Sequence, residues 1–242
     1  MTEVNWQQFW DNYRKTEIRS DQDLFFEVGK TVNRQPIAEA AFKLSIELVA
    51  RDLELKLDDR LLELCCGNGL MSVPLAALVR EIHAVDFAQH LIDNARKFRE
   101  ASNITYICAD AVTYVRELAV SKSYVPSKIL LGDALGYFEP ALLGEILRTV
   151  RNLTNNRFRF LATGIPSDEL KWNFYNTPER VRRYEDNQRL ENNFNDGLGR
   201  WWHTSELERL ARDLGLSVLV KKQPSKLSTF RVDAIFSSQC LD

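Results

Sequence analysis

Residues 60–87, RLLELCCGNGLMSVPLAALVREIHAVDF, contain the pattern that decides the fold. A short apolar run ends at Gly67-Asn68-Gly69, a helical pattern follows over 70–80, and a second short apolar run ends at Phe87. Short apolar runs bounded by turn residues are typical of buried strands. The stretch therefore predicts a strand, a glycine turn, a crossover helix and a second strand parallel to the first.

The same alternation continues toward the C-terminus. Strands are expected at 60–66, 81–87, 103–110, 127–133, 157–165, 216–223 and 229–238, and helices at 70–80, 88–101, 111–119, 141–151 and 203–215. Alternating strands and helices predict a parallel sheet with helices on both faces. The connection between the last two strands is too short for a parallel crossover, so they form an antiparallel hairpin. We predict an α/β fold with a seven-stranded, mostly parallel sheet and an antiparallel last strand.

Two segments flank or interrupt this core. Residues 1–57 are expected to form an N-terminal helical cap, with one helix over 3–16 and another beginning at Pro36, while residues 58–242 form the core. Residues 166–202 lack a strand pattern and are interpreted as a lid inserted after the fifth strand. The aromatic residues of this insertion form either a pocket for a substrate or the insertion's own small core; they are Trp172, Phe174, Tyr175, Trp201 and Trp202.

Composition excludes several classes of protein. The chain has 242 residues, with 32 Lys and Arg against 34 Asp and Glu, and a formal net charge of -2, whereas a nucleic-acid binder usually carries a basic excess. It contains no apolar stretch near the roughly 20 residues that span a bilayer, and its start does not resemble a signal peptide. Its four cysteines show no metal-ligand spacing. We expect a cytoplasmic monomer or homodimer with no metal, no membrane contact and no nucleic-acid partner.

The glycine turn is the first candidate for a ligand site. It lies at the carboxyl edge of the predicted sheet, where open α/β folds bind ligands, and Gly67 and Gly69 allow a ligand to approach the backbone. Asp86 closes the second strand, where a carboxylate can accept hydrogen bonds from the two ribose hydroxyls of an adenosine. This arrangement fits a nicotinamide dinucleotide as well as S-adenosylmethionine.

Glu63 favours the second of these ligands. A carboxylate just before the glycine turn repels a pyrophosphate and suits a ligand with an ammonium and a sulfonium group. The dinucleotide fingerprint also has a third glycine where this chain has Ser72. Asp110, at the end of the third strand, adds a third acid near the expected adenine. A nicotinamide-dependent oxidoreductase and a noncatalytic cofactor-binding module remain the alternatives.

The motifs of this region resemble those of a known family. ELCCGNGL, AVDF, CADAV and ILLGDALGYF are similar to the motif series of class I S-adenosylmethionine-dependent methyltransferases, over about residues 58–165. The resemblance implies that the loop from Glu63 to Gly69 lines the methionine part of the cofactor, that two residues hold ribose and adenine, and that two contact the adenine edge. These residues are, in the same order, Glu63, Cys65, Gly67, Asn68 and Gly69, then Asp86 and Phe87, then Asp110 and Ala111. The family usually has glycine where Cys65 stands, which implies a tighter path for the cofactor.

Three further segments resemble a narrower group. WDNYRK, DLFFEVGKTVN and FYNTPER are similar to segments of small-molecule methyltransferases from bacterial biosynthetic clusters. This resemblance implies that Tyr13, Arg14 and the pair Val28-Gly29 fold over the cofactor. It also implies a small-molecule acceptor that is methylated on a hydroxyl, amine or carboxyl group.

Methyl transfer to such an acceptor depends mostly on positioning, because the sulfonium already activates the methyl carbon. Where the acceptor must lose a proton, the candidates are Asp133 after the fourth strand, Tyr137 four residues later, and His203. Asp133 is alternatively a turn residue, a helix cap or a cofactor contact. His203 precedes a capped helix and is alternatively a surface residue.

Overall fold

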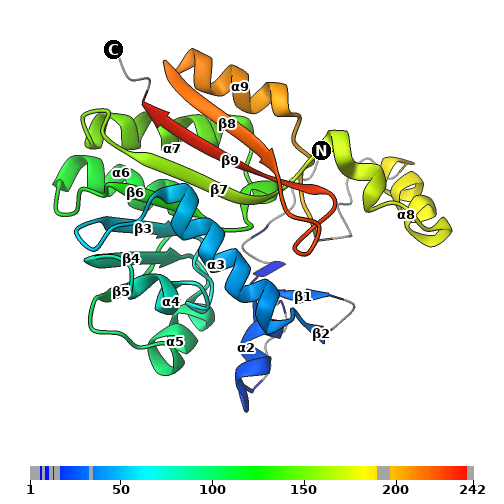
Figure 1. Ribbon diagram of the computed structural model, residues 1–242, viewed down its shortest axis with the longest axis horizontal. Coiled ribbons are helices and arrows are strands. Elements are labelled where there is room, and N and C mark those ends of the chain that lie inside the picture. The colour runs from blue at the N-terminus through cyan, green and yellow to red at the C-terminus, as the bar shows by residue number, and fades with distance from the viewer. Residues whose placement is uncertain are drawn as a thin grey trace.

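The computed structural model describes Trp6, Phe9, Trp10, Tyr13 and residues 17–32, 35–189 and 197–238. Its centre is a seven-stranded sheet with the order β5-β4-β3-β6-β7-β9-β8 (Figure 1). The strands are β3 (Arg60–Leu64), β4 (Glu81–Asp86), β5 (Ile104–Cys108), β6 (Lys128–Leu131), β7 (Arg159–Pro166), β8 (Leu216–Lys222) and β9 (Arg231–Ser238). Strands β3 to β7 pair in parallel, and β9 is antiparallel to both β7 and β8. The predicted fold class is confirmed.

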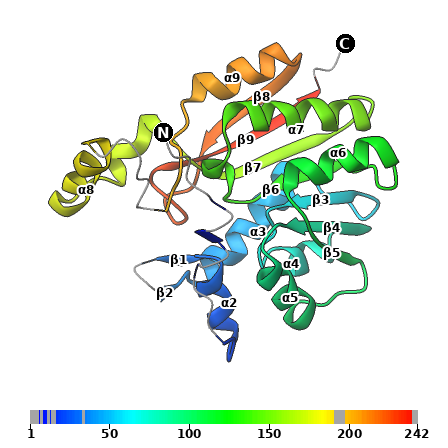
Figure 2. The same cartoon turned by 180° about the vertical axis from the view of Figure 1, so that it is seen from behind.

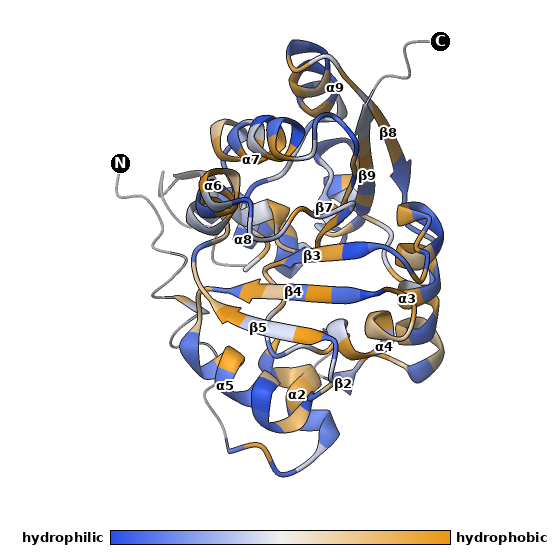
Figure 3. Cartoon of the chain, turned by 90° about the vertical axis from the view of Figure 1, so that its left-hand side faces the viewer, coloured by the Kyte–Doolittle hydropathy of each residue, from blue (hydrophilic) through white to orange (hydrophobic). Residues whose placement is uncertain are grey.

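Helices cover both faces of this sheet (Figures 1 and 2). One face carries α3 (Glu39–Leu53), α4 (Ser72–Ala76) and α5 (Gln89–Phe98), and the other carries α6 (Ala111–Ser121), α7 (Pro140–Leu153) and α9 (Thr204–Asp213). The central strands between the two layers are mostly apolar, as in β6 and β7, whereas β4 in Figure 3 has apolar positions between hydrophilic ends. Strands buried on both faces have such compositions, because neither face meets water.

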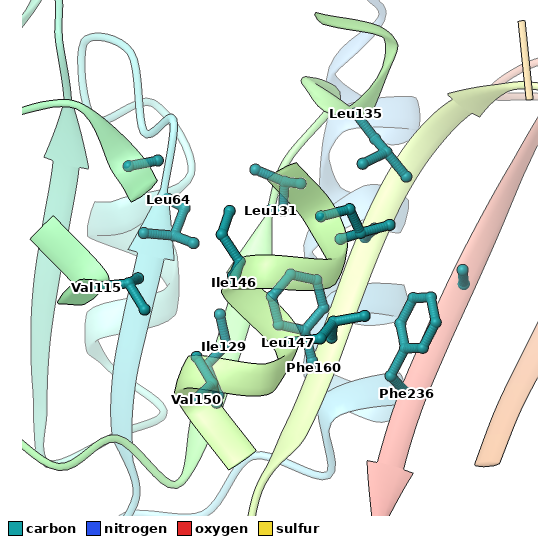
Figure 4. Packing of buried hydrophobic residues seen from close by; sticks show 14 of the residues in the cluster. Leu64, Val115, Ile129, Leu131, Leu135, Ile146, Leu147, Val150, Phe160 and Phe236 are labelled. Atoms are coloured by element: carbon teal, nitrogen blue, oxygen red, sulfur yellow. The ribbon is translucent and has the colours of Figure 1, made fainter. Parts of the chain in front are cut away.

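The alternation of side chains along β3 decides which residue reaches which helix layer. Leu62 and Leu64 pack toward α6 and α7, where Figure 4 shows Leu64 near Val115, whereas Leu61 belongs to the opposite core. Since successive side chains of a strand point to opposite faces, Glu63 lies on the same face as Leu61. That face carries α4, and this placement matters for the site.

The segment before α3 differs from the prediction. It contains α2 (Asp21–Glu27) and a small hairpin of β1 (Thr31–Val32) and β2 (Gln35–Pro36). Pro36 therefore ends a strand paired to Thr31, and the helix expected from Pro36 begins at Glu39. Proline is common in the first turn of a helix, but it is also found on edge strands. Of the helix expected over 3–16, only Trp6, Phe9 and Trp10 are described as helical.

The insertion after β7 contains a short 3-10 helix, η2 (Asp168–Asn173), and α8 (Pro178–Arg189), which lies to one side of the sheet (Figures 1 and 2). A second 3-10 helix, η1 (Leu135–Tyr137), follows β6. Within the parts of the chain described above, no helix is long and apolar enough to traverse a bilayer.

Candidate functional site

A cavity of about 500 Å³ lies at the carboxyl ends of β3, β4, β5 and β6. Its wall includes the residue that follows each of these strands, namely Cys65, Phe87, Ala109 and Gly132. The order of the strands reverses between β3 and β6, since β4 and β5 lie on one side of β3 and β6 and β7 lie on the other. Open α/β sheets bind ligands at such a switch point. The volume is within the usual range for a small-molecule site.

The cavity brings together most of the predicted site residues. Those that line it are Glu63, Cys65, Gly67, Asp86, Phe87, Asp110, Ala111, Asp133 and Tyr137. The wall also contains residues that the motif analysis did not assign, among them Trp6, Trp10, Lys30, Phe138, Leu142 and Thr163. Four acids, which lie in or just after the four adjacent strands β3 to β6, therefore share one cavity with a lysine and an aromatic wall.

Glu63 is held by the helix that follows the glycine turn. Its side chain is only 2% exposed, and the Ser72 hydroxyl at the start of α4 donates a hydrogen bond of 2.6 Å to its Oε2. Burial raises the pKa of Glu63 to about 7, and the hydrogen bond from Ser72 opposes that rise in part. The carboxyl group can therefore change its charge near neutral pH when a cation binds beside it.

Asp86 fixes the shape of the glycine turn. The backbone N–H of Gly67 donates to Asp86 Oδ2 at 2.9 Å, and the N–H of Ala88 donates to Oδ1 at 2.9 Å. Each carboxylate oxygen has two lone pairs, so an oxygen that accepts a backbone N–H can accept a ribose hydroxyl as well. Asp110 caps α6 through the N–H of Thr113 and marks the β5 end of the same wall.

Glycine is required at position 67 for two reasons. Its φ of 57° lies in the left-handed region, and a Cβ there would come within 2.8 Å of Val28 Cγ1. Val28 and Gly67 both line the cavity, so the segment after α2 covers the glycine turn directly. Cys65 has φ 58° and thus adopts the conformation that glycine favours, which explains why the family usually has glycine there. Burial raises the pKa of the Cys65 thiol, which favours its uncharged form.

Several predicted residues are not in the described wall. The Asn68 amide is buried and donates to the Leu24 carbonyl at 2.9 Å and to Glu27 at 2.8 Å, so it fastens α2 to the turn. Gly69 packs against Tyr106, whose hydroxyl leaves no space for a Cβ. Tyr13 lies against Gly29 and stacks on Phe9. Arg14 lies outside the described residues. Cofactor contact by these four residues stays a prediction.

Asp133 is the centre of an ion triad. It forms a short salt bridge with Lys30, and its Oδ1 lies 3.6 Å from Arg231 Nη1. Burial by itself raises the pKa of Asp133, but the charges of Lys30 and Arg231 outweigh it and hold the pKa below its ordinary value. Asp133 is therefore a weak proton acceptor near neutral pH, because a good general base has a pKa near that pH.

Tyr137 and two tryptophans form an aromatic wall. The ring centroids of Trp6 and Tyr137 are 4.6 Å apart, and those of Trp10 and Tyr137 are 5.7 Å apart. The Tyr137 hydroxyl donates to the Gly197 carbonyl at 2.9 Å, and burial raises the pKa of Tyr137. The phenol therefore keeps its proton at neutral pH.

His203 is not among the described residues that line the cavity. Its ring is half-exposed and lies between two carboxylates of η2, with Nε2 3.0 Å from Asp168 and Nδ1 3.5 Å from Glu169. Its backbone begins α9. The structure thus places it in a surface ion cluster, and a catalytic role for His203 has no geometric support.

The aromatic residues of the insertion pack on one another. Phe174, Tyr175 and Trp201 have ring centroids 5.0 to 6.0 Å apart, and Phe230 joins them. Trp202 is buried, and its indole N–H donates to the Leu135 carbonyl. No member of this set lines the cavity described above, although Tyr175 lines a separate hollow beside α8, and a role of these residues in acceptor binding stays a prediction.

Comparison with known proteins agrees with this geometry. Residues 61–156 match a family model described as a methyltransferase domain. A 72-residue stretch is 35% identical to the 23S rRNA (uracil(1939)-C(5))-methyltransferase RlmD of Yersinia enterocolitica, covering 30% of this chain and 14% of that protein. The chain thus spans about a seventh of that relative's length.

Two solved structures share the fold over almost the whole chain. A SAM-dependent methyltransferase of Leishmania major superposes with a TM-score of 0.62 at 12% identity, covering 96% of this chain and 82% of that one. Magnesium protoporphyrin IX methyltransferase (ChlM) of Synechocystis PCC 6803, solved with bound SAH, superposes with a TM-score of 0.57 at 11% identity, covering 98% and 95%. At these identities the similarity concerns the fold.

Proposed function

Residues 61–156 form a class I, S-adenosylmethionine-dependent methyltransferase domain, and from this premise we propose that the chain transfers a methyl group from S-adenosylmethionine to a small-molecule acceptor. The acceptor atom belongs to a hydroxyl, amine or carboxyl group. The observation that carries the proposal is the joint placement of Glu63, Asp86 and Asp110 in one cavity beside the glycine turn.

The charges of this cavity fit the cofactor. With the cofactor bound, Asp86 would accept hydrogen bonds from the ribose hydroxyls, Asp110 and Ala111 would contact the adenine edge, and Glu63 would face the methionine ammonium. A dinucleotide would instead place its pyrophosphate at the turn, where an ionised Glu63 repels it and a neutral Glu63 offers it no positive charge. Ser72 reinforces the distinction, since it occupies the place of the third glycine and binds Glu63.

The remaining wall residues suit a small acceptor. When bound, S-adenosylmethionine supplies a methyl carbon that its sulfonium activates for displacement. Trp6, Trp10 and Tyr137 cover the cavity and exclude water from the reacting atoms, while Asp133 can accept a hydrogen bond and orient the acceptor. The cavity volume of about 500 Å³ is that of a site for small molecules.

The proposal is tested with purified protein, S-adenosylmethionine and a protein-free metabolite extract. The expected result is S-adenosylhomocysteine together with an extract component heavier by one methylene unit. A parallel reaction contains total RNA in place of the extract, because the relative RlmD is a 23S rRNA methyltransferase. Methylation confined to RNA contradicts the small-molecule acceptor, and cofactor binding without turnover in either reaction favours a noncatalytic module. A cytoplasmic location and a monomeric or dimeric state remain predictions.

A further inference from the structure

The cavity has charge of opposite sign on its two sides. The acids Glu63, Asp86 and Asp110 belong to β3, β4 and β5 or to the turns that follow them. Lys30 and Arg231 gather around Asp133 on the other side of β3, where β6, β7 and β9 lie. Neighbouring strands are about 4.8 Å apart, so the start of β9 is several strand spacings from the acidic side. Lys30 and Asp133 lie nearer to the acids, because Asp133 follows β6, the strand beside β3, and the charge of Lys30 opposes the rise that burial causes in the pKa of Glu63.

The backbone of β7 is shaped to hold the ion triad of Asp133, Lys30 and Arg231. Gly164, at φ 64°, leaves the space that the Asp133 carboxylate fills, since a Cβ there would fall 1.7 Å from Asp133 Oδ1. The Gly164 N–H donates a hydrogen bond of 2.9 Å to Asp233 Oδ1. The pairing of β7 with β9 shifts register between Ala162 and Ile165. Asp133 itself has φ 51°, which is uncommon for a residue other than glycine and recurs at functional sites.

The triad has two positive charges and one negative charge. Lys30 lines the cavity, and both it and Arg231 lie against the single carboxylate of Asp133. Lys30 is the one basic residue in the described wall of the cavity, so an anionic group of an acceptor would find its counter-charge there.

The wall next to the triad is apolar and largely aromatic. The Tyr137 ring contacts those of Trp6 and Trp10, at interplanar angles of 50° and 77°, and Phe138 and Leu142 also line the cavity. Aromatic molecules bind such walls through stacked or edge-to-face ring contacts and by burial of apolar area.

Resting on the proposed function, we propose that the acceptor is a flat, apolar molecule with one anionic oxygen group, a carboxylate or an ionised phenol, and that Lys30 determines this specificity. Its anionic oxygen attacks the methyl carbon, the carbon–sulfur bond breaks, and the bonding electron pair goes to sulfur. The negative oxygen and positive sulfonium become a neutral ester or ether and a neutral thioether. An acceptor that arrives ionised needs no general base, which agrees with the states of Asp133 and Tyr137 described above.

The probes are 2-naphthoate and 2-naphthamide, which share a flat ring system and differ in one charge. Their affinities are measured by quenching of tryptophan fluorescence, with and without saturating S-adenosylhomocysteine, on wild type, Lys30→Met and Lys30→Arg. Lys97→Met is the matched control, because it removes the same charge from the exposed surface of α5. Binding of S-adenosylhomocysteine is measured on each preparation by calorimetry, so that failure of the proposed function is seen separately.

We expect wild type to bind naphthoate about tenfold more tightly than naphthamide, a difference of about 1.4 kcal/mol. Lys30→Met abolishes this preference and leaves the naphthamide affinity unchanged, whereas Lys30→Arg and Lys97→Met retain it. The inference is overturned if neither probe binds, if both bind equally to wild type, or if Lys30→Met weakens both probes alike. It is also overturned if Lys30→Met weakens S-adenosylhomocysteine but not 5′-methylthioadenosine, since Lys30 would then bind the cofactor's own carboxylate.

Discussion

The Ser72 hydroxyl donates a 2.6 Å hydrogen bond to Glu63, nine residues earlier in the chain, and so joins the end of β3 to the start of α4 across the glycine turn. A buried carboxyl with one such donor is stable in its neutral form, yet can ionise when a cation arrives. The turn is thus prepared for a ligand that carries positive charge.

Cofactor binding should release a proton. In the ligand-free protein the pKa of Glu63 is about 7, and the ammonium of S-adenosylhomocysteine beside it favours the carboxylate and lowers that pKa. Affinity should therefore rise with pH up to about 7, by at most about tenfold per pH unit, and become level above it. Calorimetry in buffers of different ionisation enthalpy measures the proton count.

Two controls accompany this titration. Glu63→Gln should bind without proton release and with no pH dependence in this range, and 5′-methylthioadenosine, which lacks the ammonium, should release no proton from wild type. Proton uptake, or an affinity of wild type independent of pH, would show that Glu63 does not meet the cofactor's positive charge.

Replacing Gly67 by alanine should destabilise the protein by roughly 1 to 2 kcal/mol, because the left-handed backbone and the contact with Val28 both oppose a Cβ. Urea unfolding measures the loss. Gly132→Ala is the matched control, since Gly132 also follows a strand in the cavity wall but has open space at its Cβ. Equal stability of the two variants would refute the assigned role of Gly67.

The Lys30–Asp133 pair should contribute roughly 1 to 3 kcal/mol of coupling energy to folding in a double-mutant cycle of Lys30→Met and Asp133→Asn. The pKa of Asp133 is depressed, so this contribution is complete above the ordinary pKa of an aspartate and is lost as pH falls through the lower pKa of the folded state. The exposed Lys43–Glu39 pair on α3 should show weaker coupling. A cycle with no coupling at neutral pH contradicts the triad.

Turnover should depend on the aromatic wall and not on His203. His203→Ala leaves the cavity intact, so S-adenosylhomocysteine production should stay within about twofold of wild type. Trp10→Leu removes a ring from the wall and should raise KM for the acceptor about tenfold, as loss of roughly 1.4 kcal/mol of contact implies. A large loss in His203→Ala, with Trp10→Leu unaffected, would place the acceptor near η2 instead.

Local signals were sufficient to predict the sheet and the acidic side of the cavity. Glu63, Asp86 and Asp110 each lie within or just after a short apolar strand, and parallel strands bring their carboxyl ends to one edge. The position of Glu63 relative to a glycine turn is likewise a matter of adjacent residues.

Long-range contacts were not predictable in the same way. Lys30 reaches Asp133 across 103 positions, and neither residue has a neighbour that indicates the other. Asn68 stands between two glycines of the turn, but its amide points to α2, a direction that a turn sequence does not specify. Pro36 fits the start of a helix and the edge of a strand equally well, and pairing with Thr31 decided between them.

The central claim is that the cavity binds a nucleoside with an ammonium group beside Glu63 in preference to an anionic dinucleotide. Calorimetric titration of the wild-type protein with S-adenosylhomocysteine, and separately with NADH, measures this directly. The account predicts one S-adenosylhomocysteine bound per chain, a binding that Asp86→Asn weakens, and no heat of binding for NADH. Saturable binding of NADH with none of S-adenosylhomocysteine would contradict it.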